Sequence, residues 1–410
     1  MASVKRVLTA AGAAAIAPFV AAGAIGVRDT MRAASARRRG IADVADVPTP
    51  EPSIGLAGAI AVDTLMTLPM GLLSSTGSAD HYARASAELD DAVRFYDTAG
   101  WLDDHTLRHP APAAVPAGPI GPLRGGLEEF TFESGWNPVD GEPGGDRWRS
   151  FSANRSVPVR LLRHPGGPRP WLVAVHGQSM GRVRDHRMLR VRRLHEELGV
   201  NVALPVLPLH GPRAEGFAPD RMFVSNVYLV NNVLGLTQAM WDLRRLLLWL
   251  RADQGAPSVG VLGLSLGSYA CSLLSTLEAD LACVIALVPQ ADLAASLRAA
   301  EPAVPSKRRL HRALYDDRAT IALRPVSPLA GPCLVPKERR FIVAGQVDRI
   351  AAPAGAAALW RHWDEPSILW RPRGHLTAGR SAEYDEHLSS ILVSSGLTAD
   401  PSSRTEHAQA

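Results

Sequence analysis

The stretch VGVLGLSLG, residues 259–267, decides the fold. Residues 259–262 are an apolar run typical of a buried strand, and helical periodicity follows over 266–277. The G-x-S-x-G pentapeptide between them is weak evidence alone, but strand, sharp turn and helix in direct succession are the context of a nucleophile elbow. Its two glycines suit a strained turn that brings strand and helix too close for side chains. We therefore predict that Ser265 is a nucleophile at a helix N-terminus, where developing negative charge is favoured.

Short apolar runs and longer helical stretches alternate on both sides of this segment. Strands are expected at 127–133, 157–163, 171–175, 202–207, 259–262, 284–288, 341–344 and 368–370, the first two antiparallel. Helices are expected at 188–198, 227–251, 266–277, 353–363 and 381–393. This alternation predicts an α/β fold, a mostly parallel central sheet with helices on both faces. In such sheets the chemistry is expected in the turns at the carboxyl ends of the strands.

Two of those turns carry titratable side chains after the serine. Asp348 lies just past the strand expected at 341–344, and His375 follows the last strand, 368–370. A serine hydroxyl is a poor nucleophile at its free pKa, so it needs a base, and the base needs an orienting carboxylate. His375 and Asp348 are the candidates for these two roles.

With Ser265, Asp348 and His375 in this order, the chain resembles the α/β-hydrolase superfamily over 127–393. The resemblance implies that His375 takes the Ser265 proton and returns it to the leaving group. It also implies that Asp348 fixes the imidazole tautomer and stabilises the imidazolium. The chain has no H-G-G-G stretch, which disfavours the hormone-sensitive-lipase-like branch.

The turn His176-Gly177-Gln178 after the strand 171–175 looks like the superfamily's His-Gly oxyanion turn. The resemblance then implies that the backbone N–H groups of Gln178 and Leu266 hold the oxyanion. Two such donors contribute on the order of 3–4 kcal/mol each to catalysis. His176 itself, and His210 at the end of the next strand, are expected to be structural.

Alternatives stay open for the acid and the base. Asp292, which follows the strand at 284–288, is a rival acid, and Asp348 would then be a surface partner of Arg349. His387 is a weaker rival base because it falls within an expected helix. His375 would then be an exposed loop histidine.

The N-terminal segment 7–27 carries no charge and is followed by a heavier positive cluster than precedes it. It could be a signal peptide, a membrane anchor, an interfacial helix or an Ala-rich helix packed on the protein. The charge asymmetry favours a membrane-associated protein with a cytoplasmic hydrolase domain; export to the cell envelope is the alternative. A second apolar stretch, 54–73, contains Asp63 and Pro69, so we expect a buried or interfacial helix there.

We divide the chain into four regions. Residues 1–108 form an N-terminal helical appendage, with a helix over 80–108, and 109–126 is a linker rich in Pro and Gly. Residues 127–397 form the hydrolase domain and 398–410 a disordered tail. The insertion 292–336 is too long for a turn and is a candidate lid over the acyl pocket.

Composition excludes several functions. With 410 residues, 46% hydrophobic content and a formal charge of +4, the chain is globular, and no basic stripe interleaved with aromatics points to nucleic acid. The three cysteines, Cys271, Cys283 and Cys333, have neither disulfide-framework nor zinc spacing. We expect no metal and no cofactor.

The predicted function is hydrolysis of a carboxylic ester through an acyl-enzyme intermediate on Ser265. The apolar N-terminal region and the inserted lid favour a lipid ester over other small-molecule esters, with a membrane surface as a further partner. An acyltransferase, a thioesterase or a peptidase would use the same three residues, and a non-catalytic binding protein is a different class. The sequence gives no indication of the oligomeric state.

Overall fold

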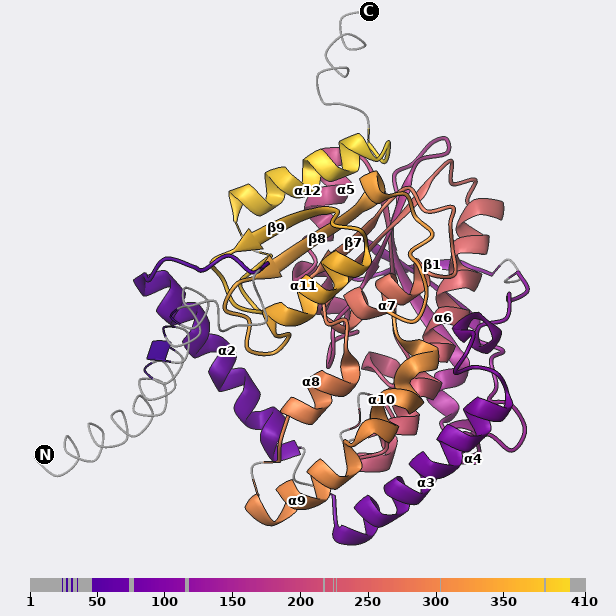
Figure 1. Cartoon of the computed structure of the whole chain (residues 1–410). Coiled ribbons are helices and arrows are strands. Elements are labelled where there is room, and N and C mark those ends of the chain that lie inside the picture. Colours follow the sequence, from indigo (N-terminus) through magenta and orange to yellow (C-terminus); the bar gives the residue numbers. More distant parts are fainter. Residues whose placement is uncertain are drawn as a thin grey trace, which may run out of the picture.

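A nine-stranded sheet forms the centre of the molecule (Figure 1). The computed structural model describes residues 24, 27, 28, 31, 35, 46–73, 77–114, 118–216, 218–223, 225, 227–302, 304–379 and 381–398. The strands are β1 (Ile120–Leu123), β2 (Leu127–Glu133), β3 (Ser156–Leu162), β4 (Trp171–Val175), β5 (Asn201–Pro205), β6 (Val259–Leu264), β7 (Val284–Leu287), β8 (Arg340–Gly345) and β9 (Ser367–Arg371). Their order in the sheet is β1-β2-β3-β5-β4-β6-β7-β8-β9.

The first three strands are antiparallel to their neighbours, and β4 to β9 run parallel to one another. From β4 the chain moves outward to β5 and then returns to β6 on the other side of β4. The order therefore reverses between β4 and β6, and the crevice at such a switch point is where α/β proteins bind ligands. The predicted fold class is confirmed, and the topology is that of an α/β-hydrolase.

Helices cover both faces of the sheet. They are α2 (Ile54–Leu73), α3 (Ala79–Thr98), α4 (Gly145–Arg149), α5 (Val191–Leu198), α6 (Leu229–Ala252), α7 (Leu266–Leu274), α8 (Leu293–Ala299), α9 (Pro305–Leu314), α10 (Asp317–Leu323), α11 (Pro353–His362) and α12 (Ala382–Ser394). Because side chains alternate along a strand, β4 sends Leu172 to the core beneath α5 and α12, and Val173 to the core shared with α6, α7 and α11.

The sequence predicts a separate N-terminal appendage followed by a linker, whereas in the structure the region before the sheet packs on the main core. Helix α3 packs against α6, α9 and α10, and its Leu89 and Tyr96 are fully buried in the main core. The segment 109–126, for which the composition predicts a linker, ends in strand β1. Pro122 fits there because β1 is an edge strand, where a missing backbone N–H costs no ladder hydrogen bond.

The apolar segment 7–27 lies outside the described residues except at positions 24 and 27, and so does the tail from 399 on. Among the helices that are described, none is both long and apolar enough to cross a bilayer. The second apolar stretch is α2, whose Leu56 and Ile60 are buried against Val347.

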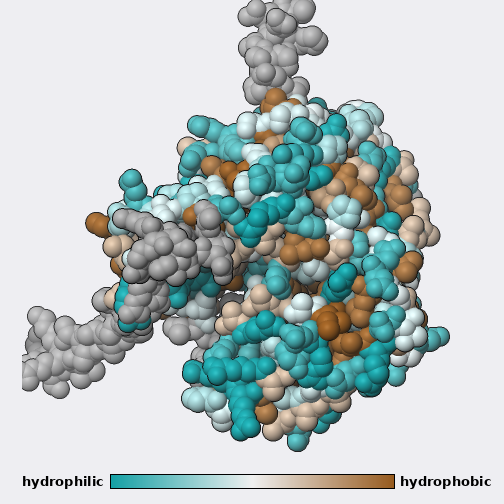
Figure 2. Space-filling model, viewed as in Figure 1, coloured by the Kyte–Doolittle hydropathy of each residue, from teal (hydrophilic) through white to brown (hydrophobic). Residues whose placement is uncertain are grey.

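The insertion between β7 and β8 holds α8, α9 and α10. Helix α10 packs on α3, α6 and α8, so the insertion and the N-terminal region form one layer beside the sheet. Figure 2 shows mainly hydrophilic side chains over α9, and Arg308 and Arg312 on that helix pair with Glu301. Its role as a lid stays a prediction.

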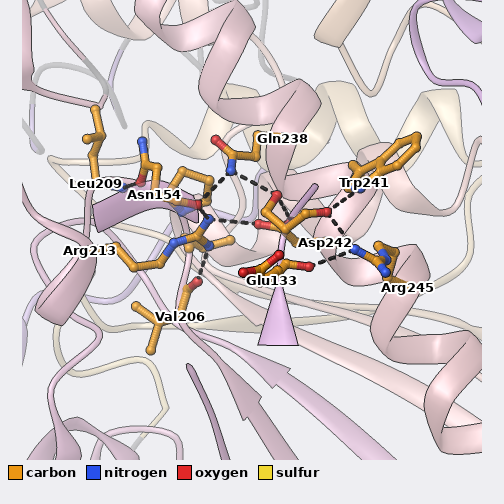
Figure 3. Close-up of polar contacts among 12 residues, drawn as sticks. Glu133, Asn154, Val206, Leu209, Arg213, Gln238, Trp241, Asp242 and Arg245 are labelled. Atoms are coloured by element: carbon orange, nitrogen blue, oxygen red, sulfur yellow. Dashed lines mark hydrogen bonds and ion pairs between the residues drawn. The ribbon is translucent and has the colours of Figure 1, made fainter. Parts of the chain in front are cut away.

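A buried polar network ties the antiparallel strands to α6 (Figure 3). Asp242 of α6 accepts a hydrogen bond from Arg213 Nη2 at 2.9 Å and another from Ser134 Oγ at 2.5 Å. Arg213 also donates to the carbonyl oxygens of Val206 and Asn154 at 2.7 and 2.8 Å. Removing charges from water is costly unless each is paired, and here both carboxylate oxygens have partners.

Candidate active site

The nucleophile elbow forms as the G-x-S-x-G segment requires. Ser265 stands between β6 and α7 with φ 56° and ψ −114°, a backbone conformation that a side chain disfavours. A Cβ atom on Gly263 would lie 2.1 Å from the Gly267 carbonyl oxygen, and one on Gly267 would lie 2.1 Å from that of Val175. Only glycine fits at these two positions, so the spacing of the motif follows from the contact between β4, β6 and α7.

Ser265, His375 and Asp348 come together in a continuous chain of hydrogen bonds. His375 Nδ1 lies 2.7 Å from Asp348 Oδ2, and His375 Nε2 lies 2.9 Å from Ser265 Oγ. Because a carboxylate only accepts, Nδ1–H donates to Asp348, which leaves Nε2 to accept the hydroxyl proton of Ser265. All three residues are buried.

The turn after β8 fixes the Asp348 carboxylate. Its Oδ1 accepts hydrogen bonds from the backbone N–H groups of Ile350 at 2.8 Å and Ala351 at 2.7 Å. Oδ2 is therefore left to face the imidazole of His375. The acid sits at the carboxyl end of a parallel strand, where the sequence places it.

The charge environment of His375 favours its protonated form. Burial lowers the pKa of the imidazole, but the neighbouring Asp348 carboxylate, through its charge and its hydrogen bond, and the charge of Asp63 outweigh burial and raise that pKa above its usual value. These two carboxylates therefore favour an imidazolium at His375.

The predicted oxyanion donors flank the serine. Leu266 is the first residue of α7, and Gly177 packs so closely on the elbow that a Cβ there would lie 3.3 Å from that of Ser265. Within the described part of the chain, neither the Leu266 nor the Gln178 backbone N–H donates to a protein acceptor. The Gln178 side chain is held by its own bonds, donating to the Phe223 carbonyl at 3.2 Å.

The two remaining histidines beside this turn have structural contacts. His176 Nε2 accepts from the Leu207 backbone N–H at 3.1 Å, and His210 Nδ1 donates to the Pro208 carbonyl oxygen at 2.8 Å. Burial lowers the pKa of His176 to about 3 and that of His210 to about 4, so both are neutral and shape the turn.

The rival acid and base lie elsewhere. Asp292 caps α8, accepting from the Ala295 backbone N–H at 2.9 Å. His387 is on α12. In the described part of the chain, neither side chain hydrogen-bonds to Ser265, and it is the Asp348 carboxylate that meets the His375 ring.

One residue of the site was not predicted. Asp63, from α2, is fully buried and accepts hydrogen bonds from the backbone N–H groups of His375 at 2.6 Å and Arg349 at 3.2 Å. The signal was an aspartate inside an otherwise apolar stretch, because a buried carboxylate needs partners. In the sequence, this aspartate indicates only that the apolar stretch is not a membrane span.

Among the described residues, no three His, Cys, Asp or Glu side chains are arranged to hold a metal ion. The three cysteines are free and buried.

Comparisons with known proteins show close relatives of unknown activity. No protein-family model matches the chain. Two uncharacterized proteins from two strains of Mycobacterium tuberculosis are each 38% identical over 368 residues, which is 87% of this chain and 86% of theirs.

Solved structures resemble the chain only distantly. Acetyl xylan esterase 1 from a Thermoanaerobacterium species is 14% identical, with a TM-score of 0.46 over 74% of this chain and 93% of its own. An acetyl xylan esterase from a Paenibacillus species is 16% identical, with a TM-score of 0.45 over 74% and 94%. A cold-adapted esterase from an Arctic metagenomic library is 13% identical, with a TM-score of 0.44 over 69% and 99%.

Proposed function

This chain belongs to the same family as the two Mycobacterium tuberculosis proteins, and because it has an α/β-hydrolase topology we propose that it is a serine hydrolase that cleaves a carboxylic ester. The observation that carries the proposal is the hydrogen-bonded chain from Ser265 through His375 to Asp348 on a strained strand-to-helix turn. Coincidence rarely leaves a buried serine, a buried imidazole and a buried carboxylate in this geometry.

In the proposed mechanism Ser265 Oγ attacks the ester carbonyl carbon while His375 Nε2 takes the hydroxyl proton. The carbonyl oxygen becomes an oxyanion, which the N–H groups of Leu266 and Gln178 stabilise. The intermediate collapses as His375 gives its proton to the departing alcohol, and an acyl ester remains on Ser265. Water, deprotonated by His375, then attacks that ester, so that a carboxylic acid leaves and the serine is restored.

Reaction with a fluorophosphonate probe tests the nucleophile. The wild-type protein should be labelled covalently, and Ser265→Ala should not. Ser272→Ala is a matched control, because Ser272 is a buried serine of the same helix α7 and its hydroxyl takes no part in the proposed chain. A wild type that resists the probe, or labelling that survives in Ser265→Ala, would refute the proposal.

The substrate class needs a second assay. Nitrophenyl esters of increasing acyl length, tested beside acyl-CoA thioesters and with an added alcohol as acceptor, separate an esterase, a lipase, a thioesterase and an acyltransferase. The proposal expects ester hydrolysis to be the fastest reaction. A preference for long acyl chains would support the lipid ester that the sequence predicts, and a preference for acetyl groups would contradict it. Membrane association stays a prediction, which fractionation of cells checks.

A further inference from the structure

Helix α2 brings a second acidic side chain to the proposed centre from a distant part of the chain. Figure 1 shows α2 beside the carboxyl ends of β8 and β9. Its Leu56 and Ile60 pack on Val347, in the turn that carries Asp348. One helical turn further on, Asp63 is fully buried.

Asp63 is bonded to both loops that supply the triad. Its Oδ2 accepts from the backbone N–H of Arg349 at 3.2 Å and from that of His375 at 2.6 Å, and its Oδ1 accepts from that of Leu376 at 3.4 Å. Contact with the histidine loop is close, since a Cβ on Gly374 would lie 2.5 Å from Asp63 Oδ2. The same carboxylate thus sets the spacing between the acid and the base.

We propose that Asp63 is a positioning residue, which fixes the Asp348 and His375 loops relative to each other. It also places a second negative charge near His375, at the backbone N–H of that residue. The proposal rests on the proposed function, because it assigns Asp63 a role in the same reaction. It also means that the centre is incomplete without the N-terminal region, which a hydrolase domain starting at 127 would lack.

The contacts favour an ionised carboxylate. Both Asp63 oxygens accept from N–H groups, and in the described part of the chain neither hydrogen-bonds to an acceptor, so a proton on Asp63 would find no partner there. Burial and the nearby Asp348 carboxylate raise the pKa of Asp63 above its usual value, and the N–H groups of His375 and Arg349 offset part of this rise. The charged groups that act on the His375 ring are the carboxylates of Asp348, from the turn after β8, and Asp63, from α2. Each raises the pKa of His375.

Asp63→Asn separates charge from shape. The amide oxygen can replace Oδ2 as acceptor for His375 and Arg349, but the negative charge is lost. We expect kcat/KM on the plateau to fall by about 10- to 100-fold, the usual cost of changing a partner that orients a functional histidine. The low-pH limb of the profile should move to lower pH, because the imidazole loses a charge that favours its protonated form. Asp63→Ala should lose more activity, as no acceptor remains.

Ile60→Ala is the matched control. It weakens the contact of the same helix with Val347 but leaves the charge in place. Its activity should fall at all pH values without a shift in the low-pH midpoint. A midpoint that does not move in Asp63→Asn, or that moves equally in Ile60→Ala, overturns the proposal. Fluorophosphonate labelling of the wild type distinguishes these outcomes from failure of the proposed function, since a serine hydrolase must still react with the probe.

Discussion

Two buried aspartates, Asp242 and Asp348, share most of their surroundings and differ in what they do. Each lies against a basic side chain, Arg213 at 2.9 Å and His375 at 2.7 Å, and each has its other oxygen occupied. The guanidinium of Arg213 keeps its proton at all physiological pH values, and its two terminal nitrogens are held by Asp242 and by carbonyl oxygens. The imidazole of His375 has one nitrogen left, and that nitrogen faces a hydroxyl.

The difference teaches what makes a buried pair reactive. A pair whose cation does not release its proton, and whose two terminal nitrogens are taken by acceptors, can only hold strands and helices together. A pair whose base can change its protonation state, and whose second nitrogen meets the Ser265 hydroxyl on a strained turn, can move a proton. The backbone differs as well: Ser265, which His375 contacts, has a positive φ, whereas Arg213 and Asp242 do not.

Removal of the Ser265 hydroxyl should have the largest effect on catalysis at the Asp348–His375 pair and no effect on the Asp242–Arg213 pair. For Ser265→Ala we expect kcat for ester hydrolysis to fall on the order of 10⁶-fold, because the nucleophile is lost. The melting temperature should stay near that of the wild type, since the methyl group keeps the elbow packed. Steady-state kinetics and calorimetry check both parts, and residual turnover close to the wild-type rate would contradict the role of Ser265.

The acid should come next. Asp348→Asn leaves the shape of the turn but presents an amide to His375, which favours the wrong tautomer, and we expect kcat to fall by about 10⁴-fold. Asp292→Asn is the control, because that residue only caps α8. If Asp292→Asn were the severe variant instead, the acid would be misassigned.

In the buried network, loss of a charged partner should lower the stability of the protein rather than its activity. Asp242→Asn leaves Arg213 charged and uncompensated, so the free energy of unfolding should drop by about 3–5 kcal/mol. Turnover per folded molecule should change little. A double change, Asp242→Leu with Arg213→Met, should recover only part of the loss, because the Ser134 hydroxyl loses its acceptor and the Val206 carbonyl loses its donor. Urea titration measures each step, and an unchanged midpoint in Asp242→Asn would be a contradiction.

The smallest effect concerns pH. His375 must be neutral to accept a proton, and its pKa is raised chiefly by Asp348 against the lowering effect of burial. Activity should therefore fall as pH drops through that raised pKa, by about tenfold per unit once the histidine is mostly protonated. Arg213 does not titrate in this range, so fluorescence from the tryptophans of the network, Trp148 and Trp241, should stay constant. A parallel loss of both signals would mean unfolding rather than titration.

Much of this could be predicted because the governing contacts are local. Strands β2 and β4 have the bounds that the apolar runs indicate, and the elbow follows from five consecutive residues. Asp348 and His375 each follow a strand, and parallel strands bring such turns to one edge of the sheet. Strand β1 was missed because Pro and Gly dominate its surroundings, and only pairing with β2 makes it a strand.

The unpredicted features are long-range pairings. Arg213 and Asp242 are 29 positions apart, and Asp63 is 312 positions from His375, so no spacing rule connects them. An aspartate in an apolar helix indicates that a partner exists but not which one. Helix α3 likewise reads as an amphipathic surface helix, and only its neighbours α6 and α10 show that it belongs to the core.

The separation of Asp63 from His375 also sets the order in which the centre can form during synthesis. A ribosome delivers Asp63 early, Ser265 midway and His375 near the end of the chain. Until the loop after β9 emerges, Ser265 lacks His375, and Asp63 lacks the N–H groups of His375 and Leu376. Contacts this distant in sequence also close slowly, because the intervening chain must lose its freedom first. On the proposed function, a growing chain therefore cannot attack esters until the loop that carries His375 has folded.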